Sequence, residues 1–231
     1  KDRSFFFFNY EGQRRRRQTT SIATVATPAQ RAGDLSTLPL QIYDPLSGNS
    51  GTGRRQPFAR NLIPTDRIDP ISRALMDYWP QPNLPGNAAN YITTVGEKVD
   101  YDQVTTRIDH HLSSKDRLMG RYNFIDQPFF RSDYAPLAGR VAPLRNNGVV
   151  AQYTRLVSPR AVNEFRFSYS RSAAQFAQEP VSENLAAQIG LKNTSTDPKE
   201  FGLPSVSISG YNGFGSFSPT IMNITDRFQW A

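Results

Sequence analysis

The sequence contains no cysteine and only two histidines in its 231 residues. Without cysteine, the chain cannot be held by disulfides and cannot build a zinc site on thiolates. It also lacks any apolar run close to the ~18 residues that a transmembrane helix needs, and it shows no signal peptide. We interpret both ends as lying within a longer protein, so the missing signal peptide says nothing about the compartment.

Apolar residues are also scarce. They make up 38% of the chain, below the ~45–50% that is usual for a globular domain, and the mean hydropathy is -0.54. Aromatic residues are nevertheless common, at 12%. Apolar character concentrated in rings and short runs is typical of transmembrane β-barrels, in which every second strand residue faces a polar lumen. The net charge of +7 is compatible with nucleic acid, anionic lipid or an anionic substrate as a partner.

Alternating apolar and polar residues predict six strands. For example, Val104 and Ile108 alternate with Arg107 and Asp109. The predicted strands lie near residues 3–12, 98–112, 116–126, 147–157, 161–172 and 221–231. Short turns at 113–116 and 158–160 join them into hairpins.

Long connections separate the hairpins, at residues 13–97, 127–146 and 173–220. The first of these contains one predicted helix, over 69–78, because Asp69 fits the N-cap and Pro70 the first helical position. Strands of ~10 residues suit a tilted crossing of a bilayer. Tight turns that alternate with long loops are typical of outer-membrane barrels, whose periplasmic turns are short and whose extracellular loops are long. We therefore predict an all-β, antiparallel transmembrane barrel segment of about six strands, in the outer membrane of a Gram-negative bacterium.

The two faces of the predicted strands differ in chemistry. One face is polar and suits a wet lumen; it carries Arg107, Asp109, Arg121, Asn123, Glu164 and Arg166. The other bears rings that suit the membrane interfaces, namely Tyr10, Tyr122, Phe124, Tyr153, Tyr169 and Trp230. The alternative is a secreted, soluble all-β binding module for carbohydrate or protein. That module would bury Phe165, Phe167 and Tyr169 against a second sheet and leave the polar face in bulk water.

Several sequence segments, in this order, resemble segments of the Oar-like TonB-dependent receptors, which carry a carboxypeptidase-regulatory-like domain. The first is the run 1–12 with its four phenylalanines, which resembles the strand that follows the plug. The other segments are 27–36, 42–45, 61–64, 67–70, 107–110, 114–116 and 163–166. The resemblance implies a barrel of about 22 strands around a plug. It also implies uptake of an unknown substrate, driven by the TonB complex through parts of the protein outside these residues.

Two groups of residues are candidates for binding. Arg14, Arg15, Arg16 and Arg17 form a basic run at a predicted strand end, and we expect them to contact lipopolysaccharide. Nucleic acid is not expected, because stacking platforms interleave rings with basic residues, whereas here the arginines follow the rings. Loops on rigid scaffolds often bind ligands, so Tyr78 and Trp79 of the helix, and Tyr211, Phe214 and Phe217 of a Gly-aromatic loop, are candidates for substrate binding.

Catalytic chemistry is not indicated. His110 and His111 are adjacent in a predicted strand, so their side chains face opposite sides and do not share a metal. Asp100 and Asp102 share a face, and could serve acid–base chemistry or bind calcium, or lie on a solvated strand end. No nucleophile elbow, phosphate loop or dinucleotide motif is present. We expect no enzyme, no cofactor and no metal site.

Overall fold

One antiparallel sheet of eight strands runs through the computed structural model, which describes residues 3–48, 55–216 and 220–231. The strands are β1 (Ser4–Ala23), β2 (Tyr91–His111), β3 (Asp116–Gln127), β4 (Phe129–Arg131), β5 (Arg140–Val141), β6 (Leu144–Ser158), β7 (Ala161–Gln178) and β8 (Ile221–Trp230). The helices are α1 (Pro28–Arg31), α2 (Pro70–Asp77) and α3 (Leu185–Gln188), with 3₁₀ turns η1 (Ala59–Asn61), η2 (Thr65–Arg67) and η3 (Pro198–Glu200). None of the helices within these residues is long and apolar enough to cross a membrane.

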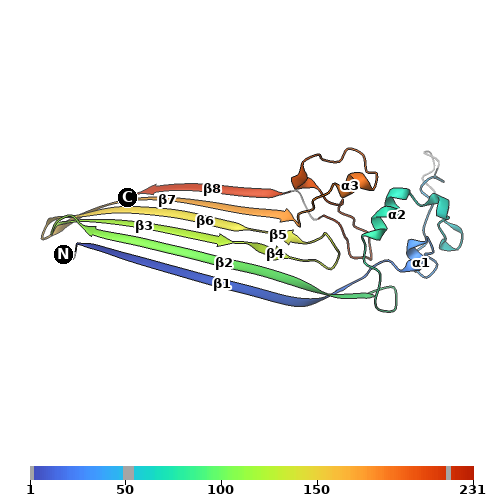
Figure 1. The fold of residues 1–231 in the computed structure, drawn as a ribbon. Helices are drawn as coiled ribbons and strands as arrows, with labels where there is room; N and C mark the ends of the chain where they lie inside the picture. The colour runs from blue at the N-terminus through green and yellow to red at the C-terminus, as the bar shows by residue number, and fades with distance from the viewer. Residues whose placement is uncertain (1–2, 49–54, 217–219) are drawn as a thin grey trace.

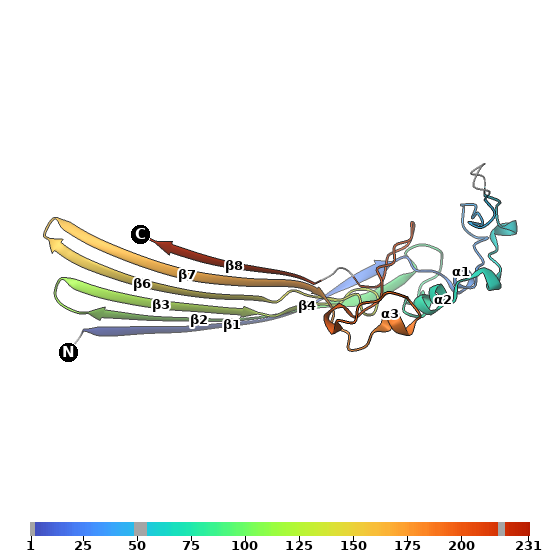
Figure 2. The same ribbon diagram turned by 90° about the horizontal axis from the view of Figure 1, so that it is seen from above.

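The six long strands, β1, β2, β3, β6, β7 and β8, pair in chain order as an antiparallel meander. The two short strands extend the sheet at one end, where β4 pairs with β2 and β5 joins β4 to β7. The predicted all-β antiparallel segment is therefore confirmed. Figure 2 shows that the long strands form a single curved layer.

Turns and loops lie at opposite ends of this layer. The tight hairpin turns gather at the end near the N-terminus, and the long connections with all three helices gather at the other end (Figure 1). The first tight turn is held by Ser113, whose hydroxyl accepts hydrogen bonds from the backbone N–H groups of Lys115 and Asp116, at 3.0 and 3.1 Å. The asymmetry is the one predicted for an outer-membrane barrel wall.

Some strands extend further than predicted. β1 continues past residue 12 to Ala23 and β2 begins at Tyr91, so the first long loop covers 24–90 and not 13–97. β7 continues to Gln178, and the predicted loop 127–146 contains β4 and β5. The extensions carry no apolar alternation, because beyond the membrane neither face of a strand needs to be apolar. Continuous cross-strand pairing, rather than a hydrophobic pattern, defines them.

Cross-strand partners share a face, and the register assigns each strand residue to a side. The predicted interface rings all lie on one side, with Tyr122 beside Val149 and Tyr169 beside Phe228. The predicted polar residues all lie on the other side, where Arg107 is opposite Arg121. A hollow on this polar side is lined by residues of β2, β3, β6, β7 and β8, so the polar side is concave. We call the two sides the outward and the inward face.

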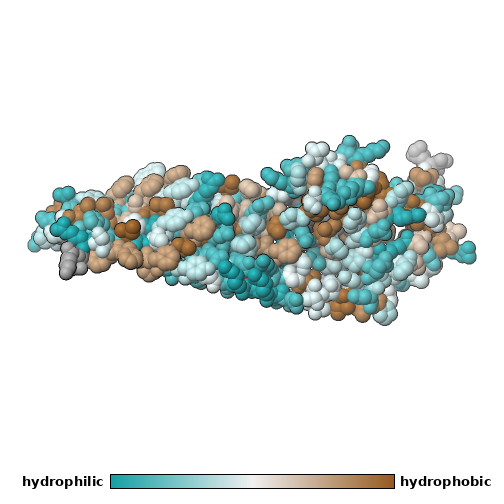
Figure 3. Space-filling view, viewed as in Figure 1, coloured by the Kyte–Doolittle hydropathy of each residue, from teal (hydrophilic) through white to brown (hydrophobic). Residues whose placement is uncertain are grey.

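The soluble sandwich is not supported. Within the described residues there is one sheet, and Phe165 on the outward face is 54% exposed rather than covered by a second layer. The inward face also carries some apolar side chains, among them Phe5 and Phe7 opposite Asp109 and Arg107, and Val150 opposite Arg121. Figure 3 shows apolar residues gathered on the strand half of the molecule, with a hydrophilic band between them and the loops.

Residues 1–231 produced alone should be insoluble in water. Within the part of the chain that the structure describes, β1 and β8 each pair with only one neighbour, which leaves two open sheet edges. The outward face also leaves large side chains uncovered, with Phe6 86% and Trp230 74% exposed. Centrifugation of refolded protein, with and without detergent, measures this, and the detergent sample is the control. A soluble, cooperatively folding monomer in plain buffer would contradict the expectation.

Candidate functional site

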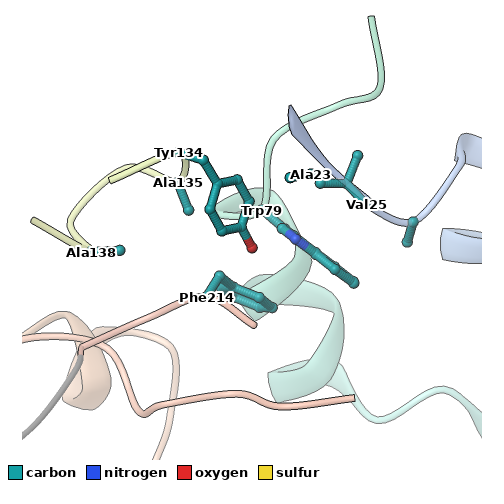
Figure 4. Packing of buried hydrophobic residues seen from close by; sticks show 8 residues of the cluster. Ala23, Val25, Trp79, Tyr134, Ala135, Ala138 and Phe214 are labelled. Atoms are coloured by element: carbon teal, nitrogen blue, oxygen red, sulfur yellow. The ribbon is translucent and has the colours of Figure 1, made fainter. Parts of the chain in front are cut away.

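The three long connections fold together into one unit, which we call the outer module. Its apolar core combines Ala23 at the end of β1 and Val25, Ala26 and Trp79 from the β1–β2 connection with Tyr134, Ala135 and Ala138 from the second loop and Phe214 from the third. Figure 4 shows these side chains converging, with the rings of Trp79, Tyr134 and Phe214 at the centre. Trp79 stacks on Phe214 with ring centroids 5.0 Å apart and meets the edge of Tyr211 at 5.5 Å.

Local sequence signals position these rings. Asp69 caps α2 as predicted, because its carboxylate accepts hydrogen bonds from the N–H groups of Ile71 and Ser72, at 2.8 and 3.2 Å. Thr27 and Gln30 form a capping box at α1, which has Pro28 at its first position. Both helices are too short to be stable alone, so the caps fix their place and packing between loops supplies the rest of their stability.

Arg31, at the end of α1, ties the two helices together. Its guanidinium donates hydrogen bonds to the carbonyl oxygens of Met76, Trp79 and Pro80, at 2.5, 3.0 and 2.6 Å. It also lies 5.7 Å from the centre of the Trp79 ring, which is a cation–π arrangement. The Met76 carbonyl belongs to the last turn of α2, and the Trp79 and Pro80 carbonyls follow its end, so one side chain holds the segment that leaves the helix and fixes the tryptophan.

Asn90 holds the start of β2 to the end of β1. Its side chain is fully buried. The amide accepts from the Val25 N–H at 2.8 Å and donates to the Val25 and Gly86 carbonyl oxygens at 2.9 and 3.2 Å. Three backbone groups in an apolar setting are thus satisfied by one amide. Neither Asn90 nor Arg31 stands out in the sequence, since their partners are backbone atoms brought close only by the fold.

The predicted substrate-binding residues meet in this module, but not all at its surface. Trp79 and Phe214 are 3% and 6% exposed, so they form the core and do not present a surface to substrate in this structure, which corrects that part of the prediction. Tyr78 and Tyr211 are half-buried and pack against the core from its margin. Substrate contact by these two tyrosines stays a prediction. Phe217 lies outside the described residues.

The sequence does not single out Tyr134, because the residue lies in a short loop with no periodicity. Its hydroxyl donates to the carbonyl oxygens of Asn212 and Gly213, at 2.8 and 2.5 Å, and so joins the second loop to the third. Burial raises the pKa of the Tyr134 phenol to about 12. The folded module therefore holds the phenol in its neutral, donating form.

The outer module should open in alkali because of Tyr134. Its folded pKa lies above the ordinary value of 10.0, so its stabilising effect is complete below pH 10 and is lost as the pH rises through about 12. In a proteolysis assay of the intact protein, we expect loop cleavage to rise steeply across this window. Tyr134→Phe should cost about 1 kcal/mol near neutral pH but make cleavage less dependent on pH. An equally steep alkaline rise in Tyr134→Phe would contradict the assignment.

The four arginines predicted to contact lipopolysaccharide lie within β1, not at a loop start. Only Arg14 and Arg16 face outward, opposite Asp100 and Lys98 in the register. Arg15 and Arg17 face inward, which corrects their predicted lipid contact; Arg15 bonds Glu97 at 3.0 Å. The acidic residues of β2 explain why a run of like charges can form a strand.

Asp100 and Asp102, the carboxylate pair considered for acid–base chemistry or calcium binding, form ion pairs with these arginines. Arg16 lies 2.5 Å from Asp100, and Arg14 lies 2.7 Å from Asp102, which also accepts a hydrogen bond from Tyr10 at 2.5 Å. Among the residues with described positions, no group of three or more His, Asp or Glu side chains is arranged to hold a metal ion. His110 and His111 face opposite sides, because their partners are the successive residues Leu118 and Arg117.

Charged pairs and tyrosines border an uncharged belt on the outward face. On β3 and β6 the pairs are Asp126–Arg145 at 2.9 Å and Asp116–Arg155 at 3.6 Å. The ten-residue step between the two aspartates spans ~34 Å along a strand at ~3.4 Å per residue, or ~24 Å at a tilt of ~45°. That height matches the ~25 Å apolar band of outer-membrane barrels.

Tyrosine hydroxyls on this face point to the polar borders. At the border near the loops, Tyr122 donates to Asn147 at 3.0 Å and Tyr169 donates to Asp226 at 2.6 Å. At the border near the turns, Tyr153 donates to Asp116 at 2.6 Å. Tyrosines with an apolar ring and a hydrogen-bonded hydroxyl suit a membrane interface.

Comparison with known proteins agrees with this geometry. A family model described as an outer membrane beta barrel domain matches residues 1–231. No curated protein matches the chain, and no solved structure matches it. The chain therefore belongs to the outer membrane beta barrel domain family, and it lies in the outer membrane of a Gram-negative bacterium.

Proposed function

We propose that this chain is part of the wall and outer loops of a TonB-dependent transport receptor. Substrate binds at the outer module and passes through a plugged lumen, and the TonB complex drives uptake through parts of the protein outside these residues. The observation that carries the proposal is the outer module itself. The described residues of three separate connections, 24–48 with 55–90, 132–139 and 179–216, fold together beyond the wall. The sequence segments that resemble Oar-like receptors support the same function.

Tyr78 and Tyr211 are the part of the module that suits substrate contact. Both pack on the buried core, so their rings have fixed positions, yet each keeps exposed surface. A rigid aromatic ring with a polar tip gives contact area at a small cost in side-chain entropy. We also propose that the protein acts by binding and transport and not as an enzyme.

Transport is tested with a deletion strain grown on single nutrients beside its parent. A nutrient that the deletion strain uses poorly is then radiolabelled, and its uptake is measured with and without a protonophore. We expect uptake to require the gene and the energised inner membrane. Tyr78→Ser with Tyr211→Ser should lower uptake, whereas Tyr43→Ser, on an exposed ring of the same outer region, should not. Equal uptake by parent and deletion strain on every nutrient would refute the proposal.

We further propose that Arg14 and Arg16 contact anionic lipopolysaccharide. Both face outward, on the loop side of Tyr10, and both side chains are about half exposed. Anionic lipid groups and arginine form charge-assisted hydrogen bonds. The paired variant Arg14→Gln/Arg16→Gln should copurify with less lipopolysaccharide, while the inward Arg15→Gln/Arg17→Gln pair on the same strand should not. Equal retention in both pairs would oppose the contact.

A further inference from the structure

The charges on the strands are divided unevenly between the two faces. The outward face has six basic and five acidic residues, and every one of them belongs to an ion pair: Arg14, Arg16, Lys98, Arg145, Arg155 and Arg171 with Asp100, Asp102, Asp116, Asp126 and Asp226. Along the described strands, the inward face has nine arginines and only four carboxylates. The arginines are Arg15, Arg17, Arg107, Arg117, Arg121, Arg131, Arg140, Arg166 and Arg227, and the carboxylates are Glu11, Glu97, Asp109 and Glu164.

Much of the inward positive charge is uncompensated within the described residues. Three inward ion pairs are those of Arg15, Arg107 and Arg166, and Arg140 also has an interaction partner. Arg17, Arg117, Arg121, Arg131 and Arg227 have no carboxylate partner in that part of the chain. Every charged residue on the outward face is paired, whereas several arginines on the inward face are not. This difference points to a negatively charged partner inside the barrel.

The excess is concentrated in one hollow near the tight turns. Arg107, Arg117, Arg121 and Arg166 line it, from three strands, beside the hydroxyl groups of Thr154 and Ser168. Arg107 and Arg121 are directly opposite each other across β2 and β3. Like charges in that position destabilise a sheet, so the arrangement costs stability unless an anion lies between them.

The carboxylates in and near the hollow do not supply that anion. Asp109 is held by Arg107 through two hydrogen bonds, at 2.6 and 2.7 Å. Glu164, on the next row, is bonded to Arg166 at 2.8 Å. Arg117 and Arg121 therefore keep their guanidinium donors available, and a guanidinium fork matches carboxylate and phosphate oxygens bidentately.

We propose that this hollow binds an anionic solute that carries carboxylate or phosphate groups. Arg117 and Arg121 bind the anion, the hydroxyls of Thr154 and Ser168 complete its hydrogen bonds, and Arg107 and Arg166 add positive potential. The proposal rests on the proposed transport function and gives it a substrate class: the inner wall selects anions on their way through the lumen.

The test is equilibrium dialysis with the purified full-length receptor in detergent at low ionic strength. The probes are radiolabelled inorganic pyrophosphate for phosphate, citrate for carboxylate and maltose as a neutral solute. We expect one or both anions to bind and maltose not to bind. The Arg117→Gln/Arg121→Gln variant should bind the anion at least about tenfold more weakly, and Lys115→Gln/Arg160→Gln, at the tight turns of the same end, should bind it normally. Heat-modifiable electrophoretic migration verifies that each variant is folded.

Three results would overturn the inference. The first is an intact receptor that binds neither anion. The second is an equal loss of binding in the two double variants. The third is an unchanged affinity in Arg117→Gln/Arg121→Gln. If the intact receptor binds no anion and this variant melts at a lower temperature, an acidic segment of the protein occupies the hollow instead. Because dialysis needs no energised membrane, anion binding without uptake would refute the transport proposal and not this one.

Discussion

Replacing Trp79 with alanine should destabilise the outer module by about 3–5 kcal/mol, the usual cost of removing a buried tryptophan. The ring stacks on Phe214 and meets the edge of Tyr211, so it joins the first loop to the third. Its removal also takes away the aromatic surface beneath the Arg31 guanidinium. Two hydrogen bonds between Thr24 and Asn212, at 2.8 and 2.9 Å, also join these loops, but they do not fill the cavity. The substitution should therefore loosen the module while leaving the strands paired.

Limited proteolysis of the full-length receptor in outer membranes measures this effect. We expect rapid cleavage within residues 24–90 and 201–216 in Trp79→Ala, with the heat-modifiable migration of the barrel unchanged. Tyr43→Ala is a suitable control, because it removes an aromatic ring that is 50% exposed in the same connection. Protease resistance equal to that of the parent protein would show that Trp79 does not hold the loops together.

Placing lysine at Ala151 should destabilise the barrel by about 2–4 kcal/mol, the cost of a lysine or arginine facing lipid near the bilayer midplane. Ala151 faces outward between Gly120 and Phe167, midway between the charged borders of β6. No large side chain is lost in this substitution, so the effect reports the environment of the position and not a cavity.

The neighbouring Val150 gives the matched control, since it lies on the same strand and faces inward, opposite Arg121. Val150→Lys should cost less than about 1 kcal/mol, because a wet lumen hydrates the ammonium group and screens its repulsion from Arg121. Equilibrium unfolding in urea, with the barrel in lipid vesicles, measures both. Equal costs at the two positions would show that the outward face does not meet lipid.

The sequence alone was sufficient to predict the part of the fold that the membrane controls. Between its borders a strand must be apolar outward and polar inward, so alternations such as Val104 and Ile108 against Arg107 and Asp109 identify both the strand and its faces. The Asp69 cap of α2 could also be predicted from the sequence, because a cap is a local interaction.

Above the membrane the sequence was less informative. Arg14 to Arg17 look like a loop start in the sequence, and only the facing carboxylates of β2, more than 80 residues away, show them to be a strand. Outside the membrane no face of a strand has to be apolar, so the alternation disappears. The cross-strand pairing partners then determine which residues form the strand.

The sequence by itself determined which side of each membrane strand meets lipid, because the two sides differ in the chemistry of adjacent residues. Only the tertiary structure decided that Trp79 and Phe214 are core rather than surface, and that the charges facing outward are all paired while many facing inward are not. Both facts depend on contacts between segments far apart in the chain, which a pattern with a period of two or 3.6 residues cannot encode.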